Sequence, residues 1–304
     1  MTTLRTIIRA TRAPFLAGPI TSVLVGAAAA LPIVGLHGWY LCLTVIGIAA
    51  VNVGLNMCND YYDHVFRSDD VNETPTPFSG GSRVIQDGIL PARAVLSWSV
   101  VAFLVGSAIG VYLAMARGPV VLWLGLAGVS IGVFTSAPPL RLNYVGHGLG
   151  ELATFLGCGP LPVIGSYYVQ AQVLTWEALW VSVVMGLLGT ALIWINEFAD
   201  YTADRLVGKQ TAVVVLGRRP GAIGYGAVVV ACYLCVIAGV LGGLLPLTAL
   251  LVLLTLPIAY VSIRRAMHDY ANVSKIVASS AATIQLYIVN GLLLCTAYAL
   301  SNWL

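Results

Sequence analysis

Residues 56–63 read NMCNDYYD and directly follow an apolar run, residues 39–55, that predicts a membrane-spanning helix. If the helix continues through this motif, Asn56, Asp60 and Asp63 lie four and three residues apart and share one face. Carboxylates at the end of a membrane span are costly unless they are paired, hydrated or bound to a cation. The stretch therefore predicts a membrane helix that ends in a cation-binding face.

A second stretch repeats this arrangement. Residues 196–205 read NEFADYTADR and again end an apolar run, so that Asn196, Asp200 and Asp204 share a helix face. Two acidic faces that meet at one site would bind a divalent metal ion such as Mg²⁺, and a metal ion in that setting indicates a phosphate ligand.

The composition determines the class of protein. Only 9% of the 304 residues are charged and 59% are hydrophobic, whereas a soluble domain carries about a quarter charged residues. The chain is therefore expected to be an all-α polytopic membrane protein that lies in a lipid bilayer, with no nucleic-acid partner. All six cysteines fall within or at the ends of apolar runs, where they are interpreted as packing residues.

Nine apolar segments are long enough to cross a bilayer, which predicts a bundle of about nine transmembrane helices in a single domain, residues 1–304. The segments are 14–34, 39–62, 94–115, 118–136, 148–168, 175–200, 222–242, 245–263 and 277–300. With the N-terminus in the cytoplasm, 14 of the 15 basic residues lie on the cytoplasmic side and only Arg117 lies outside. This orientation predicts a multi-pass plasma-membrane protein whose two acidic motifs face the cytoplasm.

The connections on the cytoplasmic side are the longer ones. The connection 63–93 is polar and rich in turn-forming residues, and such a loop beside a charged site is a candidate lid. The connection 201–221 is similar, and both follow an acidic helix end. The parallel suggests two pseudo-repeated halves, roughly 1–145 and 146–304.

The inner face combines carboxylates with basic side chains, a combination that suits a metal-bound diphosphate. Mg²⁺ would bridge carboxylate and phosphate oxygens, and arginine or lysine would neutralise the remaining charge. The basic candidates are Arg67, Arg83, Arg141, Arg205 and Lys209. An apolar bundle behind this rim suits a hydrocarbon tail, so the predicted substrate is a prenyl diphosphate that ionises to pyrophosphate and an allylic cation.

These motifs resemble the UbiA superfamily of intramembrane aromatic prenyltransferases over nearly the whole chain. The resemblance rests on Asn59-Asp60-x-x-Asp63 and Asp200-x-x-x-Asp204. Asp69, six residues after Asp63, resembles the spacing of the 1,4-dihydroxy-2-naphthoate polyprenyltransferases (the MenA type) of menaquinone synthesis. Residues 80–85, 137–142, 148–151, 165–170 and 208–211 agree with that type. Glu197 and Ala199 depart from it, because many such enzymes have Asn and Arg there.

The resemblance implies an enzyme with Mg²⁺ as cofactor and with prenyl diphosphate and an aromatic acceptor as partners. The implied metal-binding and catalytic residues are Asp60, Asp63, Asp200 and Asp204, with Asp69, Asn56, Asn59 and Asn196 assisting. The implied diphosphate-binding residues are Arg67, Arg141 and Lys209. The implied reaction is attack of the allylic cation on the acceptor's ring carbon that bears the carboxylate, with loss of CO₂.

Several alternatives stay open. The acceptor could be another quinone precursor or a lipid within the same superfamily. A different class, an ion-coupled secondary transporter, would place such carboxylates near the bilayer midplane in broken helices, whereas both motifs lie at helix ends. Glu151 is either a buried polar partner or part of the acceptor site. Arg5, Arg9 and Arg12 are interpreted as topology determinants.

Overall fold

The structure is a computed structural model that describes residues 4–301. Within that range the chain is helical, as predicted, and eight segments are long and apolar enough to cross a membrane. These segments are Ala13–Val34 (η1 and α2), α3 Gly38–Val65, α4 Ala92–Arg117, Leu149–Ala171 (α7 and α8), α9 Trp176–Leu206, α11 Arg218–Leu241, Leu247–Asp269 (η2 and α12) and α13 Val273–Ser301. The remaining predicted span, 118–136, corresponds to α5 Val120–Ser136, an apolar helix of 17 residues that is shorter than the other eight segments.

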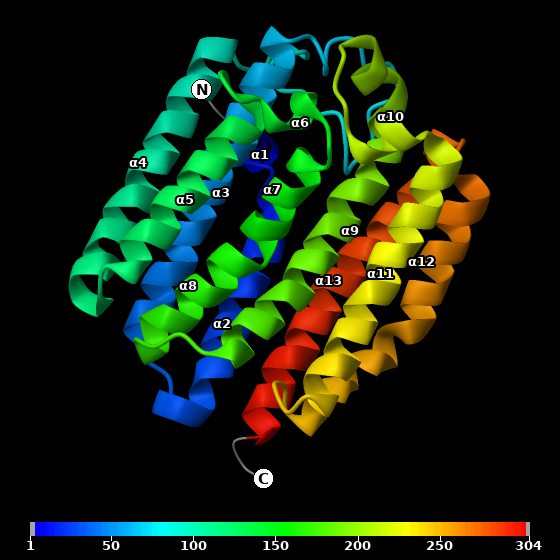
Figure 1. Ribbon diagram of the computed structural model, residues 1–304. Helices are drawn as coiled ribbons and strands as arrows, with labels where there is room; N and C mark the ends of the chain where they lie inside the picture. Colours follow the sequence, from blue (N-terminus) through cyan, green and yellow to red (C-terminus); the bar gives the residue numbers. More distant parts are fainter. Residues whose placement is uncertain (1–3, 302–304) are drawn as a thin grey trace.

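The helices form one bundle whose two acidic helices, α3 and α9, finish at the same end (Figure 1). Between α3 and α9 lie α2, α13 and the pair α7 and α8. Helices α11 and α12 lie outside α9, and α4 and α5 lie beside α3. We call this end of the bundle the acidic end; it carries the loops 66–91, 137–148 and 207–217. The short helices α6 Leu142–Val145 and α10 Ala212–Leu216 also lie there.

The acidic helices are longer than the sequence predicts. The predicted spans end at residues 62 and 200, but α3 continues to Val65 and α9 to Leu206. The acidic side chains therefore belong to regular helical turns, and each motif keeps its 3.6-residue periodicity to its last aspartate.

The fifth predicted span is broken in the middle. The chain changes direction at Gly159, between α7 Leu149–Cys158 and α8 Pro160–Ala171. A β-carbon at Gly159 would lie 2.3 Å from the carbonyl oxygen of Ser182 and 2.4 Å from the amide nitrogen of Gly186. Only glycine allows this backbone contact with α9, and the close packing holds the start of α7 beside the second acidic motif.

Candidate active site

The first acidic face has the arrangement that the sequence predicts. Asn56, Asp60 and Asp63 are all buried on α3, with side chains on the inner side of the bundle. Asn59 donates through Nδ2 to Asp63 Oδ2 at 3.0 Å and to Ser136 Oγ at 2.9 Å. These bonds fix the Asp63 carboxylate against α5, so its other oxygen is left to face the second motif.

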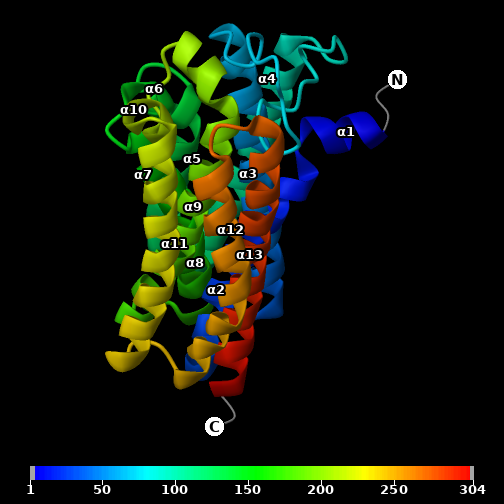
Figure 2. The same ribbon diagram turned by 90° about the vertical axis from the view of Figure 1, so that its right-hand side faces the viewer.

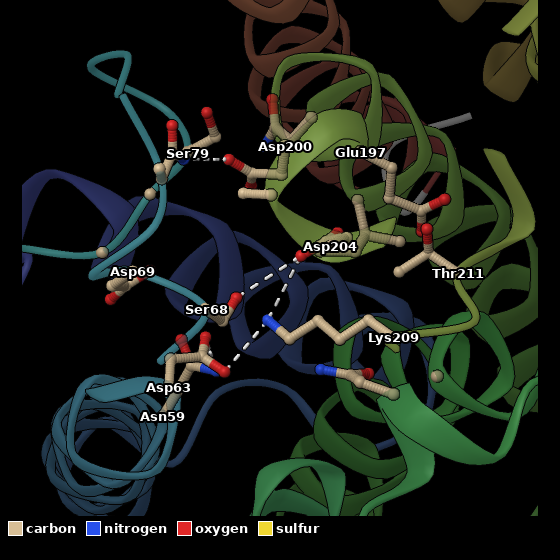
Figure 3. Close-up of a pocket in the computed structure, with 18 of the residues that line it drawn as sticks. Asn59, Asp63, Ser68, Asp69, Ser79, Glu197, Asp200, Asp204, Lys209 and Thr211 are labelled. Atoms are coloured by element: carbon tan, nitrogen blue, oxygen red, sulfur yellow. Dashed lines mark hydrogen bonds and ion pairs between the residues drawn. The ribbon is translucent and has the colours of Figure 1, made fainter. Parts of the chain in front are cut away.

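Lys209 joins the two motifs. Its Nζ lies 2.9 Å from Asp63 Oδ1 on α3 and 3.5 Å from Asp204 Oδ1 on α9 (Figure 3). Burial disfavours the ammonium form, but the two carboxylates outweigh that effect and hold the pKa of Lys209 well above its usual value. The ammonium group therefore compensates carboxylates that are 141 residues apart in the sequence.

The loop 66–91 lies over the same carboxylates, as the candidate lid was expected to do. Ser68 Oγ lies 3.5 Å from Asp204 Oδ1, and Asn72 Nδ2 donates to Asp200 Oδ1 at 2.9 Å. Ser79 also lies beside Asp200 in Figure 3. The loop follows α3 yet is bonded to α9, so it holds the two acidic helix ends together.

Arg12 is a site residue that the sequence interpretation missed. Its guanidinium pairs with Asp60 Oδ1 and lies 3.3 Å from Asn59 Oδ1. The same Asp60 oxygen accepts from the Ser82 amide at 3.2 Å. The interpretation of Arg12 as a topology determinant alone was wrong, because the chain turns at its left-handed backbone (φ 48°) and brings the side chain inward.

The motifs enclose a polar cavity of about 120 Å³. Its lining comes from both acidic helices, the loop 66–91, the 207–217 loop, the first turn of α7, Arg12 and Asn143. Its charged members are Arg12, Asp63, Asp69, Glu151, Glu197, Asp200, Asp204 and Lys209. Burial, and after it the nearby charge of Asp63, raise the pKa of Asp69 to about 8, although Arg12 and Lys209 act in the opposite direction. The cavity thus holds more acidic groups than its two cations compensate.

The donor set of this cavity fits Mg²⁺ that is shared with a phosphate ligand. Asp69 Oδ2 and Asn196 Oδ1, of two residues that line the cavity, are buried oxygens without a hydrogen-bond partner, and so is Oδ2 of Asp60, whose neighbours Asn59 and Asp63 line it. Among the described residues, no three His, Cys, Asp or Glu side chains lie close enough to hold one ion by themselves. Mg²⁺ commonly takes only one or two carboxylates and completes its shell with water and substrate phosphates. The unpartnered oxygens therefore suit an ion that arrives with a diphosphate.

The two predicted arginines lie outside this cavity. Arg67 is exposed where the chain leaves α3 in a left-handed conformation (φ 65°). Arg141 is stacked between two rings, with its guanidinium carbon 3.6 Å from the Phe66 centroid and 3.9 Å from the Tyr144 centroid. Of the three basic residues that the resemblance implied, only Lys209 lines the cavity.

Two buried glutamates support the loop that carries Lys209. Glu151 Oε1 accepts from the Ala212 amide at 2.5 Å, and Glu197 Oε2 accepts from the Val213 amide at 3.1 Å. These amides open α10 and have no partner within that helix. Glu151 is therefore a buried polar partner, although it also lines the cavity. Glu197, which departs from the MenA-type pattern, therefore has a structural role here as the acceptor for an amide at the start of α10.

An apolar cavity of about 390 Å³ lies about one helical turn further along α3, lined there by Leu55 where the polar cavity is lined by Asn59. Asn52 lines it, one helical turn before Asn56, whose Nδ2 lies 3.2 Å from Asn52 Oδ1. Its walls come from α2, α3, α4, α5, α7 and α8 and include eight glycines. A β-carbon at Gly110, Gly125 or Gly157 would meet no atom within 4 Å. Much of the cavity therefore exists because these wall positions are glycines without side chains. A charged head and a long apolar tail fit the two cavities in that order.

The fold and the cavities define a class: a multi-pass helical membrane protein with a charged chamber above an apolar one. The model of the UbiA prenyltransferase family matches residues 20–300, so the chain belongs to this family and is a prenyltransferase. It is 26% identical to a 2-carboxy-1,4-naphthoquinone phytyltransferase of Synechocystis sp., over 96% of this chain and 92% of that protein. It is 30% identical to the 1,4-dihydroxy-2-naphthoate octaprenyltransferase of Mycobacterium tuberculosis, over 59% of each chain.

Solved structures agree on the fold. A UbiA homolog from Archaeoglobus fulgidus bound to DMAPP and Mg²⁺ superposes with a TM-score of 0.66 at 14% identity, over 95% of this chain and 98% of that one. A homolog from Aeropyrum pernix in its apo form gives a TM-score of 0.65 at 18% identity, over 90% and 96% of the two chains. At such identities the likeness concerns the helical architecture.

Gly81→Ala is expected to lower the rate of prenyl transfer by roughly tenfold or more, as expected when a substitution displaces groups that position the substrate. Gly81 has a φ of +74°, and a β-carbon there would lie 2.1 Å from Asp69 Oδ2 and 3.3 Å from Asp60 Oδ1. The methyl group would therefore displace the loop from both carboxylates. Initial rates of the purified variant, compared with Gly88→Ala, test this. Gly88 has a similar φ of +66° but open space around it, so equal losses in both variants would contradict the proposed contact.

Proposed function

We propose that the protein transfers a polyprenyl group from a prenyl diphosphate to an aromatic acceptor in an Mg²⁺-dependent reaction, and that the acceptor is 1,4-dihydroxy-2-naphthoate in menaquinone biosynthesis. The observation that carries the proposal is the meeting of two acidic helix ends at Lys209, directly above a glycine-lined apolar cavity. The names of the naphthoate and naphthoquinone prenyltransferases that the chain resembles support the choice of acceptor.

In this proposal the four motif aspartates, Asp60, Asp63, Asp200 and Asp204, hold Mg²⁺. Asp69, Asn56, Asn59 and Asn196 assist as hydrogen-bonding or metal-binding groups. When bound, Mg²⁺ would neutralise the diphosphate and stabilise it as a leaving group. Lys209 and Arg12 line the cavity and would bind phosphate oxygens, while Arg141 and Arg67 would act from the rim.

The cations of the cavity would exchange partners during substrate binding. Lys209 and Arg12 now neutralise Asp63, Asp204 and Asp60. With a metal-bound diphosphate present, the carboxylates would hold the metal, and Lys209 and Arg12 would be free to bind phosphate oxygens. The buried cavity gives these charges a low dielectric constant, so each contact to the departing pyrophosphate is stronger than it would be in water.

Aromatic side chains lie beside the polar cavity. Phe66 and Tyr144 pack edge to face at a centroid distance of 5.6 Å, and Tyr62 stacks on Phe66 at 6.0 Å. Burial raises the pKa of Tyr144 to about 12, so its hydroxyl stays neutral near pH 7. Arg141 and Tyr62 already stack on these rings, so in this proposal the aromatic cluster would serve mainly to exclude water from an allylic cation.

The orientation and the domain organisation belong to the same proposal. The acidic end would face the cytoplasm across a plasma membrane, as the distribution of basic residues predicts. The chain would act as one domain, with 1–145 and 146–304 as pseudo-repeated halves that each supply one acidic helix end. The position of both motifs at helix ends argues against an ion-coupled transporter, whose carboxylates would lie near the bilayer midplane.

A prenyl-transfer assay on purified protein tests the acceptor. Geranylgeranyl diphosphate and Mg²⁺ would be offered with 1,4-dihydroxy-2-naphthoate or with 4-hydroxybenzoate, and prenylated products identified by mass. The proposal expects prenylation and loss of CO₂ with the naphthoate alone. Transfer to 4-hydroxybenzoate alone would contradict the proposed acceptor while leaving the family assignment intact.

Gly157→Leu is expected to shift the enzyme towards shorter prenyl donors. Gly157 lines the apolar cavity and has open space around it, so a leucine would fill part of the tail's path. The preference for geranyl over geranylgeranyl diphosphate should rise by roughly tenfold, the scale of a few displaced methylenes. Competition assays with both donors would measure the ratio. Gly38→Leu, also in open space but outside the cavity, should keep the wild-type ratio.

A further inference from the structure

The N-terminal helix α1, Leu4–Ala10, has an orientation unlike that of the spans. It runs across the bundle direction and projects sideways near the acidic end (Figure 2). Its large apolar side chains are largely open to the surroundings: Leu4 is 72% exposed, Ile7 41% and Ile8 45%. The first span begins at Ala13, so α1 lies where the chain enters the bilayer.

All charged side chains of residues 4–12 are positive. They are Arg5, Arg9 and Arg12, and the first acidic residue of the chain is Asp60. Arg5 is exposed beside the apolar residues. A helix that presents apolar and basic side chains together fits the layer between lipid headgroups and acyl chains, where anionic phosphates attract the arginines.

The end of α1 is attached to the loop over the site. Arg9 donates through Nε to the Ser82 carbonyl at 2.8 Å and pairs with Asp87 Oδ2 at 2.5 Å. Ala10 is fully buried in a small core with Met57 and Val84. Movement of α1 is therefore transmitted to residues 82–87, directly after the glycine pair that packs on the acidic cluster.

We propose that α1 binds the headgroup layer of an anionic bilayer at the acidic end and thereby fixes the loop segment 80–88. Leu4, Ile7 and Ile8 enter the upper acyl region, and Arg5 binds lipid phosphate. The occupant is a bilayer and not a second copy of the chain, because the apolar face adjoins the entry of the first span and carries positive charge. Positive faces on two copies would repel each other.

Hydrogen–deuterium exchange in nanodiscs tests the proposal without requiring any enzymatic activity. The protein would be placed in discs of phosphatidylcholine alone and in discs containing phosphatidylglycerol, and exchange followed at residues 5–12 and 80–88. Both segments are expected to exchange more slowly in the anionic discs. Arg5→Gln should reduce the difference in exchange rate between the two kinds of disc about fivefold, because one arginine near an anionic surface contributes about 1 kcal/mol.

Arg219→Gln is the matched control, because it removes the same charge from an exposed position at the start of α11, away from α1. It should keep the full lipid effect. Equal exchange of residues 5–12 in both kinds of disc would overturn the proposal, as would protection that appears only when two copies share a disc. Protection of α1 without any change in residues 80–88 would overturn the link to the loop. Peptides from α9 report whether each variant is folded.

Discussion

Asp60→Asn and Asp200→Asn are each expected to reduce prenyl transfer by at least about 10³-fold, because metal-assisted stabilisation of a leaving group supplies several kcal/mol. Asparagine keeps the shape of the side chain but removes the negative charge that the cation needs. Asp60 Oδ2 is buried and unpartnered, so the loss falls on an oxygen that is available to a ligand. Turnover of geranylgeranyl diphosphate at saturating Mg²⁺ would measure the effect.

The control is Asp269→Asn, which makes the same change at the end of α12, outside the polar cavity. It should keep wild-type turnover. Thermal unfolding of Asp200→Asn should stay close to wild type, since this variant only removes one negative charge from an acidic cluster, whereas Asp60→Asn also removes the partner of Arg12 and should unfold at a lower temperature. A double Asp60→Asn, Asp200→Asn variant with substantial activity would refute the metal-site assignment.

Lys209→Met is expected to abolish transfer and to destabilise the metal-free protein by about 3–5 kcal/mol, the cost of leaving a buried charge without its partner. The ammonium lies 2.9 Å from Asp63 and 3.5 Å from Asp204, and methionine fills similar space without charge. Mg²⁺ would then replace the missing cation. The rise in the melting temperature on adding Mg²⁺ should therefore be larger in the variant than in the wild type.

Lys209→Arg serves as the control for this experiment because it retains the positive charge. Its metal-free melting temperature should lie nearer to that of the wild type than to that of Lys209→Met. A methionine variant with wild-type stability and no added response to Mg²⁺ would contradict the account of Lys209 as a cation that neutralises both motifs.

The helical class, the spans and the acidic faces could be predicted because each depends on local periodicity. An apolar run of about 20 residues predicts a span. Asn and Asp at spacings of three and four predict one face, whatever the rest of the chain does. The bundle brings these two faces together, as the sequence predicted. The duplication of the two halves stays a prediction, since it concerns ancestry and not a contact.

The roles that could not be predicted from the sequence depend on tertiary contacts. Arg12 reaches Asp60 from 48 positions away, and no motif spacing connects the two. The stacking of Arg141 on Phe66 and Tyr144 follows from a left-handed turn that its basic character does not reveal. Glu197 departs from the family pattern, yet its carboxylate accepts from the Val213 amide of α10, which no sequence motif indicates. Such roles become visible only when the fold places distant segments together.

The proposed function requires the two acidic helix ends to bind one metal–diphosphate jointly. The most direct measurement is calorimetric titration of geranylgeranyl diphosphate into the detergent-solubilised protein, with Mg²⁺ and with EDTA, for the wild type, Asp63→Asn and Asp204→Asn. We expect tight binding only with Mg²⁺, and a loss of that Mg²⁺ dependence in either variant, although Asp63 and Asp204 belong to different helices. Equal affinity in EDTA, or an unchanged Mg²⁺ response in one of the variants, would contradict it.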